Sequence, residues 1–163
     1  MIVFRPTARF AFNHPAHFIA FGFGAGLSPF APGTAGTLVA FPLWWLIGTF
    51  YDPLVFFGLL AFFFAVGVWA CEVTGRHLGI GDHGSMCWDE VVAFLLVLAL
   101  TPQDPWWQAA AFFLFCAFDV VKPPPIRQLE ARIKGGFGVM FDDILAAGYT
   151  LLVLALAKRF LFP

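Results

Sequence analysis

Carboxylates stand beside three of the apolar stretches of this 163-residue chain. Asp89 and Glu90 directly precede one stretch, Asp119 ends another, and Asp142 and Asp143 precede the last. A helix dipole explains one acid at a helix start better than it explains two. Ionisable side chains at the edge of hydrocarbon are costly and are therefore candidates for function.

The acids come without nearby thiol ligands, which favours a hard, oxygen-seeking cation such as Mg²⁺. We predict that all five carboxylates bind metal and that four of them act directly in catalysis. The predicted ligands are Asp89, Glu90, Asp119, Asp142 and Asp143, and the catalytic four exclude Asp119. The sequence leaves open which of them ligate the ion and which cap a helix.

Basic side chains accompany the acids in the segment from Lys122 to Asp143. Lys122, Arg132 and Lys134 are predicted to bind phosphate oxygens, arginine as a bidentate fork and lysine as a point charge. Each could also form an ordinary surface ion pair. Phosphate binding is the interpretation that accounts for the acids and the bases together.

A glycine- and proline-rich segment, Gly22–Thr37, precedes the first apolar stretch. Thr34 and Thr37 are predicted to bind substrate there, because backbone amides at a helix start favour an anion. One of the two threonines could instead be the N-cap of the helix that follows. The segment is no Walker loop, since no Gly-Lys-Ser/Thr follows it.

His83 lies beside Asp82 and is predicted to be a general acid or a phosphate contact. The other histidines, His14, His17 and His77, are interpreted as interfacial or surface residues. Glu72, near the end of an apolar stretch, either faces the same site or extends to water.

Composition indicates the elements that position these residues. The chain is 61% hydrophobic and 12% charged, against about 25% charged in soluble domains, and its mean hydropathy is +0.85. Lipid is therefore the expected solvent. The net charge of -1 argues against nucleic acid as a partner.

Five apolar runs predict an all-α, polytopic membrane bundle of about five hydrophobic helices, and three of the runs are shorter than a full span. A further stretch, His14–Phe23, predicts an N-terminal interfacial or re-entrant helix. The runs are Leu38–Phe50, Leu54–Val73, Val91–Leu100, Trp106–Val121 and Ile144–Leu161.

Threading five spans places the acid-bearing segments on one side of the membrane. That side would hold most of the basic residues, so the positive-inside rule predicts that it is cytoplasmic. Its basic residues are Arg5, Arg9, Arg76, Lys122, Arg127, Arg132 and Lys134, against Lys158 and Arg159 on the other side.

In order and spacing, the motifs of this chain resemble those of the phosphatidylglycerophosphatase A family over nearly the whole length. Phe30 and Ala93 depart from the family pattern, where a basic residue and a glycine are common. The matching segments are Gly24–Pro29, Ala31–Leu38, Asp82–Ser85, Trp88–Glu90, Phe118–Asp119, Lys122–Pro123, Lys134–Gly138 and Asp142–Asp143.

The resemblance implies one membrane-embedded phosphatase domain over residues 1–163, in the cytoplasmic (inner) membrane of a bacterium. It implies Mg²⁺-dependent hydrolysis of phosphatidylglycerophosphate to phosphatidylglycerol and phosphate at the cytoplasmic leaflet. Attack by metal-activated water is the favoured mechanism, and a covalent phospho-aspartate is the alternative. The soluble aspartate-nucleophile motif is not found in the sequence, which favours water.

Other functions remain open at this stage. A cation or proton transporter would place its acids nearer the bilayer midplane, often in repeated halves. A phosphatidyl alcohol transferase would show a long Asp-Gly…Asp…Asp pattern, which is not found here. A phosphatase acting on another lipid phosphomonoester, such as phosphatidic acid, stays an alternative. The oligomeric state is not predicted.

Overall fold

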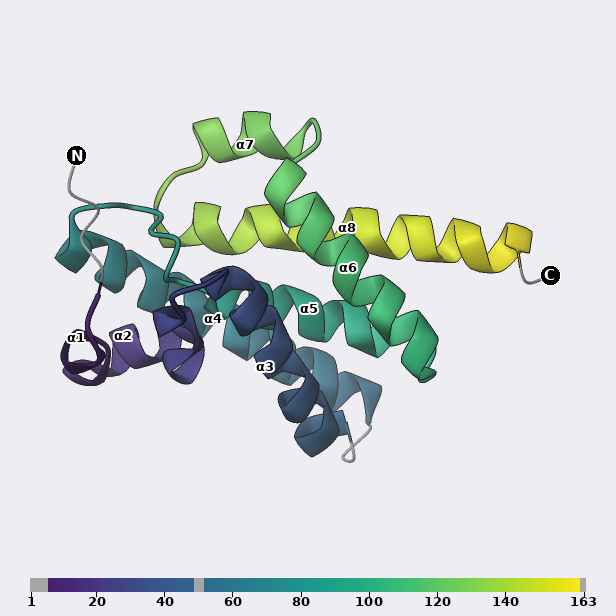
Figure 1. The fold of residues 1–163 in the computed structure, drawn as a ribbon, viewed down its shortest axis with the longest axis horizontal. Helices are drawn as coiled ribbons and strands as arrows, with labels where there is room; N and C mark the ends of the chain where they lie inside the picture. Colours follow the sequence, from purple (N-terminus) through teal and green to yellow (C-terminus); the bar gives the residue numbers. More distant parts are fainter. Residues whose placement is uncertain (1–5, 49–51, 162–163) are drawn as a thin grey trace.

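The computed structural model of this protein describes residues 6–48 and 52–161 (Figure 1). Arg5, the last residues of the first apolar run and Tyr51 lie outside these ranges. Regular structure in the described ranges is helical, in the order α1 (Ala8–Phe12), α2 (Pro15–Ala20), η1 (Gly22–Leu27), α3 (Pro32–Ile47), α4 (Pro53–Leu78), α5 (Trp88–Leu100), α6 (Pro105–Val121), α7 (Ile126–Arg132) and α8 (Gly135–Leu161).

Local signals explain where the long helices begin and end. Pro53 and Pro105 stand in the first turns of α4 and α6, where a missing N–H costs nothing. Asp52 and Asp104 cap these two helices by accepting hydrogen bonds from backbone N–H groups. Lys122 ends α6 in a left-handed conformation with φ of 44°, and the three prolines after it prevent continuation.

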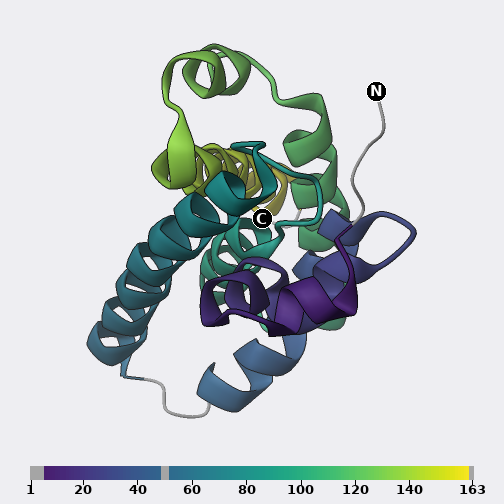
Figure 2. The same ribbon diagram turned by 90° about the vertical axis from the view of Figure 1, so that its left-hand side faces the viewer.

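Helix α5 forms the centre of the bundle. It packs against α8, α3, α4 and α6, and nearly all its side chains are buried. Figure 2 views α8 almost end-on, with the other long helices around it. Thirteen residues rise about 20 Å, less than the roughly 30 Å of a hydrocarbon core. Helix α5 is therefore an enclosed core helix rather than a full span.

All five predicted apolar runs are helical, but not all are long enough to cross a membrane. Within the described residues α4 and α8 pass that test, and α6 with α7 would make a third span across a 53° bend. Helix α3 is apolar but short. The prediction of about five membrane-crossing helices is thus not confirmed, since two or three meet the length requirement.

Two boundaries differ from the sequence prediction. The segment between Lys122 and Asp143 contains α7, and α8 begins at Gly135 rather than at Ile144. Helix α3 begins at Pro32, six residues before the expected start. In both cases glycine-rich motifs that appeared to be loops are helical, because packing against α4 and α5 outweighs their weak intrinsic propensity.

The N-terminal segment forms α2 and the 3-10 helix η1. Helix α2 packs on α4 and buries Ala16, His17 and Ala20. The prediction that His17 is a surface residue is therefore wrong. Whether this segment is interfacial or re-entrant stays a prediction.

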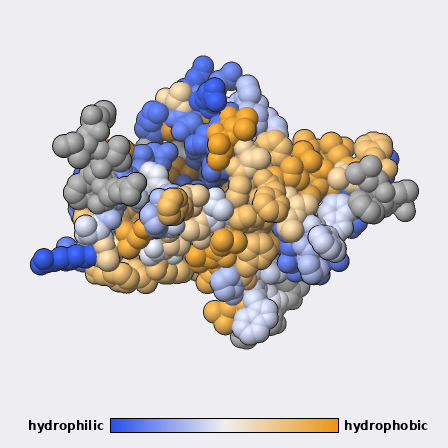
Figure 3. All heavy atoms as spheres, in the orientation of Figure 1, coloured by the Kyte–Doolittle hydropathy of each residue, from blue (hydrophilic) through white to orange (hydrophobic). Residues whose placement is uncertain are grey.

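Polar and apolar surfaces are separated in space (Figure 3). Hydrophilic residues gather over α7 and the loops beside it, whereas the exposed sides of α6 and α8 are largely hydrophobic. Phe113 on α6 and Leu152 on α8 are among the large apolar side chains left exposed there. Such surfaces suit contact with lipid.

Candidate active site

The first acid pair lies on the first turn of the central helix. Asp89 and Glu90 are only 8% and 9% exposed, because α5 is buried from its first residue. Trp88 holds this end of α5, since its indole N–H donates to the Phe63 carbonyl of α4 at 3.1 Å. Gly67 of α4 lies against Trp88, at a distance that a Cβ atom would not allow.

The second acid pair lies on α8. Asp142 and Asp143 are 4% and 2% exposed and stand two turns inside the helix. The prediction that they begin the helix is therefore wrong. Their burial comes from α4, α5 and α6, which all pack on α8.

The two pairs form one electrostatic cluster with Asp119 at the end of α6. Asp143 interacts with Asp89, Glu90, Asp119 and Asp142. In each of the four buried acids one carboxylate oxygen has no hydrogen-bond partner in the described part of the chain. Buried anionic oxygens without partners are costly, and a bound cation would reduce that cost.

The donor set fits Mg²⁺, although the side chains do not form a closed cage. Among the described residues no three or more histidine, cysteine or acidic side chains lie close enough to hold an ion together. Mg²⁺ is commonly bound by one or two carboxylates, several waters and substrate phosphate. An open set of unpartnered carboxylate oxygens is consistent with that mode of binding.

Lys122 is the basic residue that contacts the acids. Its ammonium group is ion-paired with Asp142 and, at 3.1 Å, with Glu130 of α7. The left-handed end of α6 turns this lysine toward α8. It thus joins α6, α7 and α8 beside the acid cluster.

The other two predicted phosphate ligands are exposed. Arg132 ends α7, and Lys134 directly precedes α8. Lys134 lines a cavity of about 210 Å³ together with Asp82, Glu130 and Asp142. The structure therefore brings Lys134 to the acid cluster, whereas Arg132 is not among the residues that line this cavity.

The two predicted threonines lie inside α3. The cap position belongs to Ala31, which makes no side-chain cap bond, so the prediction of a threonine N-cap is wrong. Thr37 is buried and donates its hydroxyl to the Gly33 carbonyl at 3.2 Å. A Cβ atom on Gly33 would strike the Glu90 carboxylate. The start of α3 thus abuts the acid cluster, while substrate binding by Thr34 and Thr37 stays a prediction.

His83 is buried in the loop before α5. Its Nδ1 accepts a hydrogen bond from the Ser85 backbone at 3.1 Å. It lines a cavity of about 440 Å³ that also includes Asp82 and Ser28. His83 therefore shares a cavity with Asp82, which interacts with the acid cluster. The role of His83 in catalysis stays a prediction.

Three residues of this region were not predicted as site residues. Asp82 interacts electrostatically with Asp89, Glu90 and Asp142. Asp82 could have been predicted from the sequence, because it is an acid in the glycine-rich loop just before Asp89 and Glu90. Glu130 had no such signal, because α7 was not expected. For Glu72 the signal was an acid near the end of an apolar stretch.

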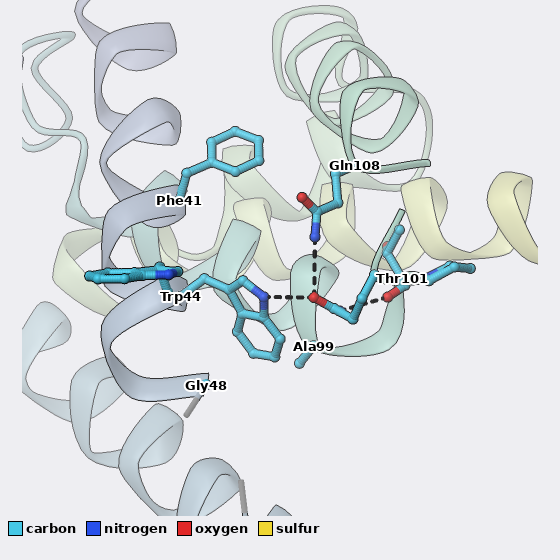
Figure 4. Close-up of a pocket in the computed structure, with 9 residues that line it drawn as sticks. Phe41, Trp44, Gly48, Ala99, Thr101 and Gln108 are labelled. Carbon is cyan, nitrogen blue, oxygen red and sulfur yellow. Dashed lines mark hydrogen bonds between the residues drawn. The ribbon is translucent and has the colours of Figure 1, made fainter. Parts of the chain in front are cut away.

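A larger cavity lies at the other end of the bundle (Figure 4). It measures about 780 Å³ and is lined by α3, α6 and the end of α5, including Trp44 and Gln108. Gln103 accepts hydrogen bonds there from both residues, at 2.9 and 3.2 Å. The ten residues from Asp89 to Ala99 place it about 15 Å along α5 from the acids.

Comparisons with known proteins identify relatives of this chain. The sequence profile of the phosphatidylglycerophosphatase A family matches residues 18–158. Phosphatidylglycerophosphatase A of Escherichia coli is 41% identical over 145 residues, covering 85% of this chain and 81% of that protein. The Haemophilus influenzae protein of the same name is 40% identical, with 91% of both chains covered.

A Bacteroides thetaiotaomicron protein, provisionally named phosphatidylinositol-3-phosphatase, is 39% identical over 150 residues, covering 86% of this chain and 91% of that protein. No solved structure matches. The profile match and the two relatives of one name agree with the ordered motifs along the chain, and together they show that this chain belongs to the phosphatidylglycerophosphatase A family.

Proposed function

We propose that this protein hydrolyses phosphatidylglycerophosphate to phosphatidylglycerol and phosphate. Two relatives at about 40% identity carry the name of that activity. The observation that carries the proposal is the buried acid cluster with Lys122 at its edge. Hydrolysis of a phosphomonoester needs positive charge near phosphate and a means of activating water.

We further propose that the reaction depends on Mg²⁺. Asp89, Glu90, Asp119, Asp142 and Asp143 would hold the ion, and the unpartnered oxygens of the four buried acids support this assignment. When bound, Mg²⁺ neutralises phosphate charge and lowers the pKa of attacking water.

The side chains of this protein then have distinct tasks. Lys122 and Lys134 pair with phosphate oxygens, and Arg132 reaches the same phosphate from the end of α7. A carboxylate of the cluster accepts the proton of the attacking water, and His83 protonates the leaving group or contacts phosphate. Direct attack by water is preferred to a phospho-aspartate, because the sequence lacks the motif of the soluble aspartate-nucleophile phosphatases.

The site is proposed to face the cytoplasm from the inner membrane of a bacterium. Of the described basic residues, Arg76, Lys122, Arg127, Arg132 and Lys134 lie at the acid-bearing end of the bundle. Lys158 and Arg159 lie at the opposite end of α8, near the C-terminus marked in Figure 1. This asymmetry follows the positive-inside rule.

The test is phosphate release by the purified protein from phosphatidylglycerophosphate in detergent micelles, with and without Mg²⁺. Release that requires the ion is expected. Folded protein that releases no phosphate under either condition refutes the proposal. Asp104→Asn is the matched control, because it changes an acid at the other end of the bundle.

Another lipid phosphomonoester is the second candidate substrate, and the Bacteroides relative is the observation that favours it. A panel of phosphatidylglycerophosphate, phosphatidic acid and phosphatidylinositol 3-phosphate separates the candidates by kcat/KM. We expect phosphatidylglycerophosphate to be preferred by at least tenfold.

A further inference from the structure

We propose, on the basis of the function proposed above, that Glu72 is a positioning residue for the reaction. Its carboxylate, presented by α4, holds the first turn of α8 and so sets the position of Asp142 and Asp143. It contacts neither acid. Glu72 was expected from the sequence to face the acids or water, and in the structure its side chain is 35% exposed and also accepts a hydrogen bond from the start of α8.

The contacts of Glu72 divide between its two oxygens. Oε2 accepts a hydrogen bond from the Gly136 backbone N–H at 2.8 Å, across 64 positions of sequence. Oε1 accepts from the Arg76 guanidinium at 2.7 and 2.9 Å, one turn along α4. Arg76 therefore holds one side of the carboxylate while the other side faces α8.

Helix physics explains why α8 needs this carboxylate. The first N–H groups of a helix have no partner within it, and the helix start carries partial positive charge. The first turn of α8 contains no acidic residue of its own. Glu72 supplies from a neighbouring helix the acceptor oxygen that an N-cap side chain provides at other helix starts.

The glycines at the start of α8 make this contact possible. A Cβ atom on Gly136 would strike the Val68 carbonyl and crowd the backbone of Glu72. Gly135 has φ of +79°, a conformation that favours glycine, and its α-carbon faces the Glu72 carboxylate. Because neither glycine has a side chain, Gly135 and Gly136 leave room for α4 and the Glu72 carboxylate to approach the start of α8.

Helix α4 holds both acid-bearing helices. Trp88 ties the start of α5 to the Phe63 carbonyl, and Glu72 ties the start of α8 to a point further along α4. Gly67 lies between these points and contacts both Trp88 and Met140. The seven residues from Gly135 to Asp142 rise about 10 Å, so a shift at the helix start reaches the acids with little attenuation.

The test compares four variants that separate three properties of the Glu72 side chain, namely its length, its charge and its ion pair with Arg76. Glu72→Ala removes the acceptor, and Glu72→Asp keeps the charge but withdraws it by one methylene. Glu72→Gln keeps an acceptor oxygen at the same reach without the charge. Arg76→Gln breaks the ion pair and leaves the carboxylate on Gly136.

We expect kcat on phosphatidylglycerophosphate to fall about 10²-fold in Glu72→Ala and Glu72→Asp, since a 1 Å misplacement can cost that much. KM should change little, because no substrate contact is lost. Glu72→Gln should recover most of kcat, and Arg76→Gln should stay within about threefold of the parent protein.

Hydrogen–deuterium exchange of residues 134–141 gives a readout besides activity. Exchange should accelerate in Glu72→Ala and Glu72→Asp, and stay near the parent rate in Glu72→Gln and Arg76→Gln. Equal losses of kcat in Glu72→Gln and Glu72→Ala, or unchanged exchange in both Glu72→Ala and Glu72→Asp, would overturn the proposal.

The experiment also separates this proposal from the proposed function. If the parent protein releases no phosphate from the lipid, the proposed function fails, and exchange alone decides whether Glu72 holds α8. If Glu72→Ala does not fold, the comparison of Glu72→Asp with Glu72→Gln decides the same question.

Discussion

Lys122 and Asp142 form an ion pair that joins the end of α6 to the third turn of α8. Lys122 also reaches Glu130 of α7, so one ammonium group connects three helices beside the acid cluster. Asp142 is nearly fully buried, whereas Glu130 is partly exposed. The two pairs therefore differ in what their removal should cost.

Lys122→Gln should lower kcat/KM for phosphatidylglycerophosphate by at least about 10²-fold, because it removes the positive charge that pairs with the phosphate and with Asp142. It should also destabilise the protein by a few kcal/mol, since a buried carboxylate loses its counter-ion. Glu130→Gln is the matched control and should cost at most about 1 kcal/mol. Steady-state kinetics and thermal unfolding in detergent provide the two measurements. Similar losses in both variants would contradict a special role for Lys122.

Neutralising the buried acids should separate function from stability. Asp89→Asn, Glu90→Gln, Asp142→Asn and Asp143→Asn should each abolish phosphate release. Without metal, Asp89→Asn, Glu90→Gln and Asp143→Asn should not lower the unfolding midpoint, because each removes a buried charge with an unpartnered oxygen. Asp142→Asn should lower it, because this variant also breaks the ion pair with Lys122.

Asp104→Asn provides the control for those four variants. Asparagine is as good an N-cap as aspartate, so activity and stability should both remain near the parent values. An acid-cluster variant that keeps full turnover would be removed from the predicted catalytic set.

Metal removal should abolish turnover reversibly. A chelator should stop phosphate release, and added Mg²⁺ should restore it. Mg²⁺ at 100 times its dissociation constant should stabilise the folded protein by about 2.7 kcal/mol, because it binds the folded state. Thermal unfolding with and without Mg²⁺ measures this shift. The shift should disappear in Asp143→Asn, and its persistence there would place the ion elsewhere.

His17 should make a contribution to stability that falls on acidification. Burial lowers the pKa of His17 below 6.5, with smaller effects in the same direction from His77 and His14 and an opposing one from its bond to the Phe10 carbonyl. Protonation of His17 therefore favours the unfolded state, so the contribution of His17 to stability is constant above about pH 6.5 and falls as the pH drops below it.

Thermal unfolding between pH 7.5 and 5 measures this dependence. The unfolding midpoint should fall by a few degrees more in the parent protein than in His17→Asn, which cannot titrate. Parallel curves for the two proteins would contradict the assignment to His17.

Much of this protein could be predicted from its sequence, because the relevant signals are local. Apolar runs predict helices in lipid, and Asp52 and Asp104 mark two helix starts by caps of short range. The four buried acids could be recognised because an acid beside hydrocarbon is costly in any tertiary arrangement. They are Asp89, Glu90, Asp142 and Asp143. The ordered motifs predicted the family, which the comparisons confirm.

The tertiary structure alone decided which of these features meet. Burial of most of α5 arises from neighbouring helices, and no periodicity within its thirteen residues distinguishes it from a span. Helix α8 begins at Gly135 because Glu72, 64 positions from Gly136, supplies an acceptor for its first turn. Contacts between residues so far apart depend on how helices pack, and that information is not present in any local pattern.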